Sequence, residues 1–183
     1  MLGVARHVAF LRGINLPGRR VGRDALAACF EGMGFSDVET FRASGNVIFD
    51  AGDGAPAKLT ARIERGLGES LGYDVKTFLR TEDQVRAIAE SRPFDRALVE
   101  ASKGKLQVAM LSSQPAKAVR TEVLALATED DRLAFGDREL YWLPSGGTQR
   151  SALNLAAIEK RVGAWTMRTL GTVEQIAGKF FGD

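Results

Sequence analysis

The stretch Val8-Ala9-Phe10-Leu11 returns 100 positions later as Val108-Ala109-Met110-Leu111. A second repeated segment lies further along the chain. Arg80-Thr81 returns 88 positions later as Arg168-Thr169, and similarly spaced apolar residues follow each copy. Two separate echoes in the same order indicate internal duplication. The sequence therefore predicts one structural unit of roughly ninety residues, present twice and fused.

Hydrophobic periodicity gives the order of elements within the first unit. Apolar runs bounded by turn residues predict strands, and apolar residues at a spacing of three or four predict helices. Thr81 and Gln84 form a capping box for a helix that trails the last strand. The expected strands lie at 4–11, 38–41, 47–49 and 75–79, and the expected helices are marked by apolar positions at 26–33, 59–71 and 85–88.

The second half repeats this order. Its expected strands lie at 106–111, 133–135, 140–143 and 165–168, and its helices are marked by positions 119–126, 155–162 and 173–180. The order βαββαβ is that of the ferredoxin-like fold. We therefore predict an α+β protein, a tandem duplication of two ferredoxin-like βαββαβ units, each with a trailing helix. The expected halves are 1–92, which carries an elaborated basic loop, and 93–183, with the join at 92–105.

Composition restricts the class of protein. The chain has 183 residues, of which 45% are hydrophobic and 26% charged, as in ordinary globular proteins. No apolar run approaches the roughly 20 residues that span a bilayer, and the N-terminus lacks a signal-peptide pattern. One cysteine, Cys29, and one histidine, His7, cannot form a disulfide or a standard zinc site. We expect a cytoplasmic protein without a membrane partner, a metal or a cofactor.

The predicted topology brings two polar loops of the first unit to the same end of its sheet. These loops follow the first strand and join the second and third strands. Their guanidinium, amide, hydroxyl and glycine backbone groups suit a small anionic or nucleotide-like ligand. The alternative is ordinary turn chemistry, in which the asparagines bond their own backbone. The candidate ligand-binding residues are Arg12, Gly13, Asn15, Ser44, Gly45 and Asn46.

A second polar loop, residues 145–151, comes just before a predicted helix. Backbone amides together with Arg150 could hold a phosphate there, although the loop lacks a Walker A ending. The alternative is a flexible loop in which Ser151 caps the helix. Arg168 ends the last strand, and we expect it to approach Arg150 and Ser151. Two guanidinium groups without a carboxylate predict a secondary anion site at these three residues.

The first thirty residues carry five arginines and one aspartate, a local charge of +4, within a chain whose net charge is +2. This distribution supports a rival function, a nucleic-acid or protein interaction module that uses the basic loop 12–23. RNA-recognition modules need aromatic residues on their third strand, where this chain offers only Phe49. The small net charge and the missing platform favour the small ligand. No residue is assigned as nucleophile or general base, so enzymatic activity and oligomeric state stay open.

Three further expectations concern single residues. Arg80 is expected to contact the acidic loop 51–57. Asp131 follows a predicted turn and is expected to be a solvated loop charge. Tyr141 and Trp142 alternate along a strand, so one is expected to face the core and the other a groove or a partner.

Several of these motifs together resemble a bacterial family classed as a domain of unknown function, number 1697. The resemblance rests on Phe10 to Asn15, on Ser44 to Phe49 (Ser-Gly-Asn-Val-x-Phe), and on Pro93-Phe94, Tyr141, Pro144, Ser151 and Arg168. It implies a duplicated ferredoxin-like α+β fold and no established activity. This chain has Thr169-Leu170 where the family usually has Asn-Trp. If that pair contributes to a shared site, this member binds differently or not at all.

Overall fold

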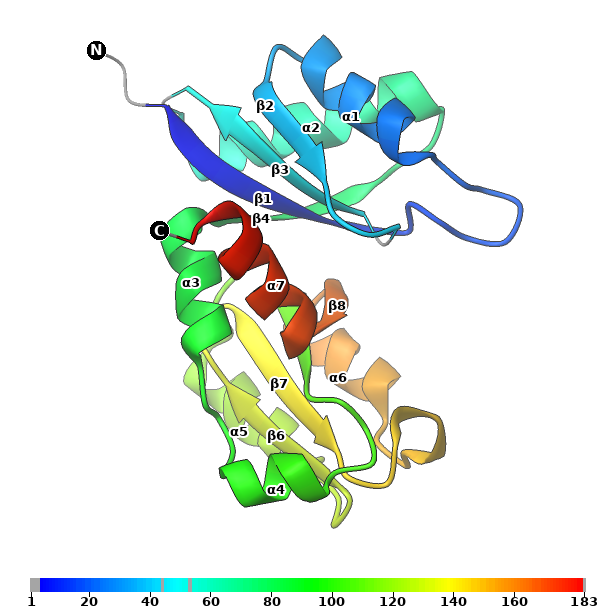
Figure 1. Cartoon of the computed structure of the whole chain (residues 1–183). Coiled ribbons are helices and arrows are strands. Elements are labelled where there is room, and N and C mark those ends of the chain that lie inside the picture. The colour runs from blue at the N-terminus through cyan, green and yellow to red at the C-terminus, as the bar shows by residue number, and fades with distance from the viewer. Residues whose placement is uncertain (1–3, 44, 53, 183) are drawn as a thin grey trace. The chain divides into compact units, whose positions relative to one another are not determined.

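Strand β1 (Ala5–Arg12) holds the centre of the first sheet, because five consecutive residues, His7–Leu11, are buried along it. It pairs antiparallel with β3 (Asn46–Ala51) and with β4 (Lys76–Thr81). β2 (Ser36–Thr40) pairs with the outer side of β3, which gives the order β2-β3-β1-β4. The computed structural model describes residues 4–43, 45–52 and 54–182 of the chain. Figure 1 shows the elements in chain order.

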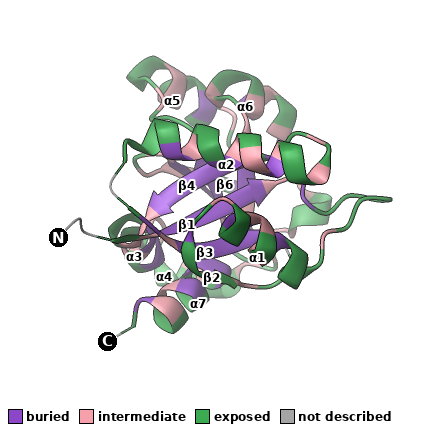
Figure 2. Cartoon of the chain, turned by 90° about the horizontal axis from the view of Figure 1, so that it is seen from above, coloured by how far each residue is buried: buried purple, intermediate pink, exposed green. Residues whose placement is uncertain are grey.

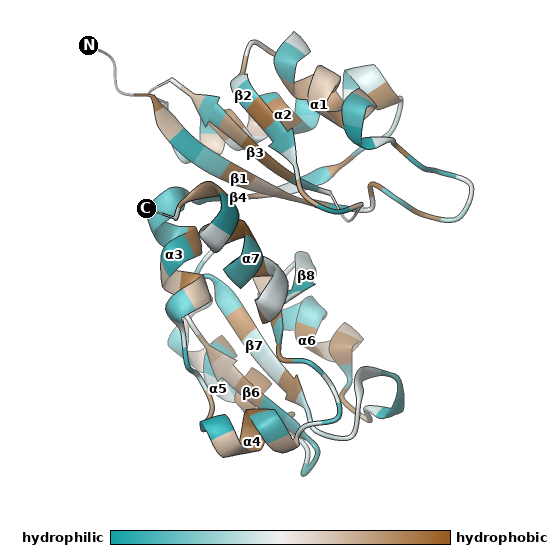
Figure 3. Cartoon of the chain, viewed as in Figure 1, coloured by the Kyte–Doolittle hydropathy of each residue, from teal (hydrophilic) through white to brown (hydrophobic). Residues whose placement is uncertain are grey.

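Two helices cover one face of this sheet, α1 (Arg23–Gly32) and α2 (Pro56–Leu71). Phe30 of α1 packs against Phe49 of β3, with ring centroids 5.2 Å apart. Leu59, Ile63 and Leu67 supply the buried side of α2. Figure 2 shows exposed positions on both helices and buried strands beneath them. Figure 3 shows the hydrophilic and hydrophobic positions that alternate along α1, as expected of a helix with one buried face.

The second sheet repeats this arrangement. β5 (Gln107–Leu111) lies between β7 (Glu139–Pro144) and β8 (Trp165–Thr169), and β6 (Asp131–Phe135) pairs with β7, so the order is β6-β7-β5-β8. Helices α5 (Lys117–Leu124) and α6 (Leu155–Val162) contribute to the core on one face. The remaining helices are α3 (Glu82–Glu90), α4 (Arg96–Ala101), the 3₁₀ helix η1 (Thr148–Arg150) and α7 (Leu170–Phe180).

The sequence echoes occupy equivalent strands. Val8 of β1 pairs with Arg80 of β4, and Val108 of β5 pairs with Arg168 of β8. Helices α3 and α7 directly follow β4 and β8, as the trailing helices were expected to do. The prediction of two ferredoxin-like units in tandem is confirmed. None of the helices in the described part of the chain is long and apolar enough to cross a membrane.

The contacts divide the chain into two units, 1–85 with 179–183, and 86–178. The predicted division into the halves 1–92 and 93–183 stays a prediction. The join at 92–105 is not a plain linker, because it contains α4. An ion pair from Arg96 to Glu100, 2.6 Å long, supports this short helix at a spacing of four residues.

The contact expected between Arg80 and the acidic loop 51–57 stays a prediction. The structure shows that Arg80 is buried, with only 1% of the residue exposed. Its Nη1 donates to the carbonyl of Leu79 at 2.9 Å. Arg80 is paired with the fully buried Val8, and paired residues point to the same face of a sheet, which here is the face opposite α1 and α2.

Candidate functional site

The two polar loops of the first unit do lie together. The backbone N–H of Leu11 donates to the carbonyl of Gly45 at 2.8 Å. Gly45 has a φ of +75°, and a methyl group placed on it would lie 2.7 Å from Cγ2 of Ile14. Only glycine fits this conformation and this close approach. The topology therefore predicted the proximity of the loops correctly, while Ser44 lies outside the described residues.

Both asparagines are bonded to the backbone of these loops, Asn15 across the two loops and Asn46 within its own turn. The Asn15 side-chain amide donates to the carbonyl of Ala43, and its Oδ1 accepts from the backbone N–H of Val21 at 3.0 Å. Asn46 is fully buried, and its Nδ2 donates to the carbonyl of Phe41 at 2.9 Å. A ligand could reach Asn46 only by opening this turn. The alternative of turn chemistry therefore fits the bond of Asn46, whereas the Asn15 amide links one loop to the other.

Of the other first-unit candidates, Arg12 is half-buried and Gly13 has a φ of +73°. Arg12 lies opposite Lys76 in the register of β1 and β4. Two cations thus sit side by side at this end of the first sheet. That placement is compatible with an anion, but the glycine and asparagine groups around it have structural roles.

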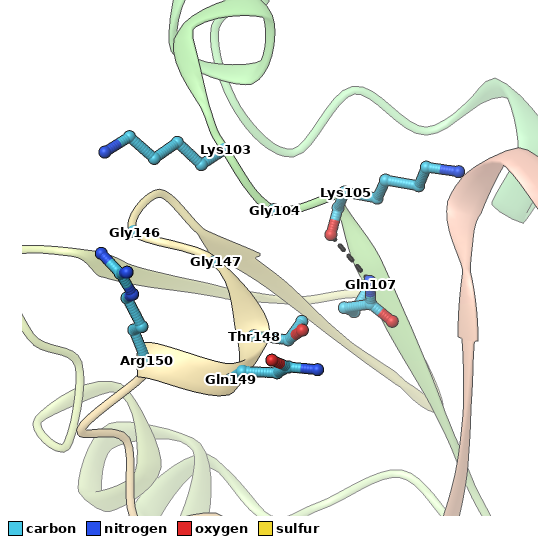
Figure 4. A pocket seen from close by; sticks show the side chains of 9 residues that line it. All are labelled: Lys103, Gly104, Lys105, Gln107, Gly146, Gly147, Thr148, Gln149 and Arg150. Carbon is cyan, nitrogen blue, oxygen red and sulfur yellow. Dashed lines mark hydrogen bonds between the residues drawn. The ribbon is translucent and has the colours of Figure 1, made fainter.

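The second unit contains a groove of about 430 Å³, drawn in Figure 4, which we call the basic groove. Its walls come from the segment before β5, from the start of β5, and from the loop that follows β7. Three exposed cations, Lys103, Lys105 and Arg150, contribute to it. The lining residues are Lys103, Gly104, Lys105, Gln107, Gly146, Gly147, Thr148, Gln149 and Arg150.

Backbone hydrogen bonds fix the two walls of the basic groove against each other. Lys103 N–H donates to the carbonyl of Ser145 at 2.9 Å, and Gly104 N–H donates to that of Pro144 at 3.1 Å. A methyl group on Gly104 would lie 2.5 Å from Cγ and from the carbonyl oxygen of Pro144. Gly147, with a φ of +95°, also donates to the Pro144 carbonyl, at 2.8 Å. Glycine is required at both positions, and the walls meet at the level of the backbone.

The charged residues in the described lining of the basic groove are all cations, and the nearby carboxylate of Asp130 lies beside that lining. No described lining residue is a carboxylate, and neither the two lysines nor Arg150 forms a salt bridge with a carboxylate in the described ranges. Asp130 flanks the loop, since a methyl group on Gly146 would lie 3.7 Å from its Oδ2. Figure 4 shows the Lys103 and Arg150 side chains extending to one side of the loop, and Lys105 extending to the other.

A buried carboxylate anchors the end of the loop. Asp131 is 1% exposed, its Oδ1 accepts from Trp142 Nε1 and Ser151 Oγ at 2.7 Å each, and its Oδ2 accepts from Thr128 Oγ1 at 2.7 Å. Burial alone would raise the pKa of this carboxyl. The three hydrogen bonds together lower the pKa by more than burial raises it, so the pKa lies below its ordinary value. Asp131 thereby ties Ser151, the neighbour of Arg150, to the second sheet.

Two expectations about this loop are wrong. Asp131 is not a solvated charge, because it starts β6 and points to the same face as Leu133 and Phe135, into the core. Ser151 does not cap α6, because the helix begins at Leu155 and Asn154 Oδ1 accepts from its third residue, at 2.9 Å. The Ser151 hydroxyl instead donates to Asp131 and accepts from Leu153 N–H.

The predicted convergence of Arg168 on Arg150 and Ser151 is also wrong. Ser151 bonds to β6, whereas Arg168 belongs to β8, at the opposite edge of the sheet and roughly 14 Å away across three strand spacings. Arg168 also faces away from the Asp131 side. It is buried and donates to Thr166 Oγ1 at 2.8 Å and to the Met167 carbonyl at 2.9 Å. Burial lowers the pKa of this guanidinium to about 10.

Tyr141 and Trp142 point to opposite faces of β7, and both are buried, at 3% and 4% exposure. The expectation that one of them faces a groove or a partner therefore fails in the described structure. Among the described residues, no cluster of three or more histidine, cysteine or acidic side chains could hold a metal ion.

Residues 4–141 match the sequence profile of a family described as Protein of unknown function (DUF1697). The chain belongs to this family. The match ends at Tyr141, so Lys103 and Lys105 fall inside it and Arg150 falls beyond it. No curated protein matches the chain.

A solved structure with the same fold is the conserved bacterial protein SP0830 from Streptococcus pneumoniae. The two chains are 18% identical with a TM-score of 0.71, and the similarity covers 96% of this chain and 97% of the other. At this identity the likeness concerns the fold alone, which it supports over nearly the whole DUF1697 chain.

The two lysines of the basic groove were not among the binding residues predicted from the sequence. They were assigned to the join between the two halves, because Ser102-Lys103-Gly104-Lys105 has the composition of a linker. The sequence feature that could have indicated them is a glycine, Gly104, between two lysines directly before a predicted central strand. Such a segment starts beside the loop that follows the neighbouring antiparallel strand, which is the 145–151 loop.

Proposed function

We propose that this DUF1697 protein binds a small anionic ligand, of a phosphate-bearing or nucleotide-like kind, in the basic groove. The observation that carries the proposal is that three exposed cations line one concavity whose described lining contains no carboxylate, with Lys103 and Arg150 extending to the same side of the loop. Lysine and arginine provide charge-assisted donors, which make the stronger class of hydrogen bonds. The glycines at 146 and 147 leave the backbone open to a close approach by the ligand.

The lining also favours binding over turnover. Among the described residues it contains no histidine, cysteine or carboxylate, which leaves Thr148 and the two lysines as its groups of nucleophile or general-base type. Gln107, Thr148 and Gln149 provide neutral polar groups that could orient the uncharged part of a ligand. Because the cations are exposed, binding at this site should weaken as salt is added.

The first-unit loops remain a second location for such a ligand. Arg12 would supply the charge there, next to Gly13 and opposite Lys76. This location is weaker because both asparagines are already bonded to the backbone, Asn15 across the two loops and Asn46 within its own turn. The two locations lie on different units, so separate variants can distinguish them.

A thermal-shift titration with inorganic pyrophosphate and with AMP tests the proposal. A ligand at about 100 times its dissociation constant stabilises the folded protein by about 2.7 kcal/mol. We expect Lys103→Gln combined with Arg150→Gln to abolish the shift. Lys160→Gln combined with Arg132→Gln is the matched control, since it removes one exposed lysine and one exposed arginine elsewhere on the same unit.

The outcomes separate the two locations. Loss of the shift in the groove variant alone supports the basic groove. Loss in Arg12→Gln alone would move the ligand to the first-unit loops and refute the groove. Absence of any shift in the unmodified protein, or an equal shift in all variants, would refute anion binding at both.

A further inference from the structure

The loop between β1 and α1, residues 13–22, forms a projecting arm (Figure 1). Leu16 and Arg19 close its tip through two backbone hydrogen bonds, each 2.8 Å long. Pro17 and Gly18 occupy the two central positions of this turn, and Gly18 has a φ of +76°. Proline followed by a glycine of positive φ is the pattern of a type II turn. The tip is therefore a defined hairpin and not an extended loop.

Contacts with the body of the first unit hold the arm in position. Tyr73 Oη donates to the carbonyl of Ile14 at 3.3 Å, and the Val21 N–H donates to Asn15 Oδ1 at 3.0 Å. The guanidinium carbon of Arg19 lies 3.8 Å from the centroid of the Tyr73 ring. An arm that is already ordered loses less conformational entropy when it binds a partner.

Arg19 and Arg20 of the arm, and Arg23 at the start of α1, form no ion pair with a carboxylate in the described ranges. Arg19 is paired with an aromatic ring, and Arg23 donates to Oγ1 and the carbonyl of Thr40 at 3.2 and 3.0 Å. Arg20 is exposed, and across the described ranges none of the three forms an ion pair with a carboxylate, the exposed Asp24 included. Arg6, in contrast, pairs with two carboxylates of the sheet.

An apolar residue stands at the tip beside these charges. Leu16 is 47% exposed, one of the few large hydrophobic side chains at the described surface. A narrow hairpin with arginines and a Leu-Pro tip has the chemistry of arms that enter a groove of double-stranded nucleic acid. Single strands would need a stacking platform, but Phe49 of β3 faces the helices and packs on Phe30.

We propose that the arm binds the phosphate backbone of double-stranded nucleic acid. Arg19, Arg20 and Arg23 contact phosphates, and Leu16 seats in the groove between the strands. This proposal does not depend on the basic groove, which belongs to the other unit. We expect this binding to be independent of base sequence, because contacts to phosphates position a protein without reading bases.

Fluorescence anisotropy with a labelled DNA duplex of about 25 base pairs tests the arm through the salt dependence of binding. Three phosphate contacts predict a slope of about −2.7 in log affinity against log salt, or about a 40-fold loss between 50 and 200 mM. Arg19→Gln combined with Arg20→Gln leaves one contact, so the loss should fall to about 3- to 4-fold. Arg65→Gln, on an exposed position of α2, is the control and should change nothing.

A further variant guards against a folding defect. Arg20→Gln alone removes an exposed side chain and should reduce the slope by about 0.9. Unchanged slopes in both arm variants would overturn the proposal. So would loss of duplex binding in the groove variant Lys103→Gln with Arg150→Gln, or binding of the arm to phosphatidylserine vesicles and not to the duplex.

Discussion

Replacing Asp131 by asparagine tests how a buried charge holds the loop that carries Arg150. The amide is nearly the same size, and its Oδ1 can still accept from Trp142 Nε1 and Ser151 Oγ. Its Nδ2 replaces the oxygen that accepts from Thr128 Oγ1, and this hydroxyl can turn to become the acceptor. Asp131→Asn therefore removes the charge and keeps the packing.

The expected loss follows from the three bonds. A hydrogen bond to a charged group contributes about 1.5–3 kcal/mol, and a neutral one contributes about 0.5–1.5 kcal/mol. Three such differences amount to roughly 3 kcal/mol, and relief from burying a charge offsets part of this. We expect Asp131→Asn to lower the free energy of unfolding by about 1–3 kcal/mol at neutral pH.

The effect should depend on pH. The pKa of Asp131 in the folded protein lies below its ordinary value of 3.8. Its stabilising contribution is therefore fully present above that ordinary value and is lost as the pH falls through the folded pKa. In strong acid the carboxyl is neutral, like the amide. The difference between the two proteins should therefore shrink toward zero as the pH falls through the folded pKa of Asp131.

Urea unfolding followed by tryptophan fluorescence measures this difference. Both tryptophans of the chain, Trp142 and Trp165, belong to the second sheet, so the signal reports the unit that contains Asp131. Asp130→Asn, at an exposed neighbour, is the control and should stay within about 0.5 kcal/mol of the unmodified protein. Equal stability of Asp131→Asn at neutral pH, or a gap that persists in acid, would refute the reasoning.

Two glycine substitutions test the close approaches that shape the loops. Gly45→Ala should destabilise by about 2–4 kcal/mol in thermal unfolding, because of its positive φ and the 2.7 Å contact with Ile14. Gly13→Ala shares the positive φ without any close neighbour, so it should cost only about 1 kcal/mol; equal losses would contradict the packing argument. Gly104→Ala should destabilise the second unit and weaken pyrophosphate binding at least tenfold, since Pro144 cannot move aside; unchanged affinity measured by calorimetry would show that the groove does not need this contact.

The fold could be predicted from the sequence because its central strands carry the repeated residues. Val8–Leu11 and Val108–Leu111 are almost entirely apolar, and both strands have a neighbour on each side. A strand of this kind tolerates few polar residues, so the pattern survives divergence. Helix α4 was missed because it has no fully buried residue and therefore leaves no apolar stripe.

The candidate sites were predicted less well because side-chain direction depends on register. Topology correctly placed the first-unit loops together, but it could not show that Asn46 points into the turn. Arg168 lies on the edge strand β8 and on the face opposite Asp131, and neither the edge nor the face follows from the end of the sheet at which a residue lies. A shift of one residue along a strand reverses the face, so residues at one end can still lie on opposite sides.

The two proposed binding regions differ because the duplicated units diverged at opposite ends of equivalent sheets. The arm follows the end of β1, whereas the basic groove forms beside the start of the equivalent strand β5. At the end that matches the arm, the second unit has only a short connection from Leu111 to Lys117. At the end that matches the groove, the first unit has Asp50 paired with Arg6, which compensates the charge. Each unit thus retains the scaffold and exposes positive charge at one end, so arm and groove variants should act independently.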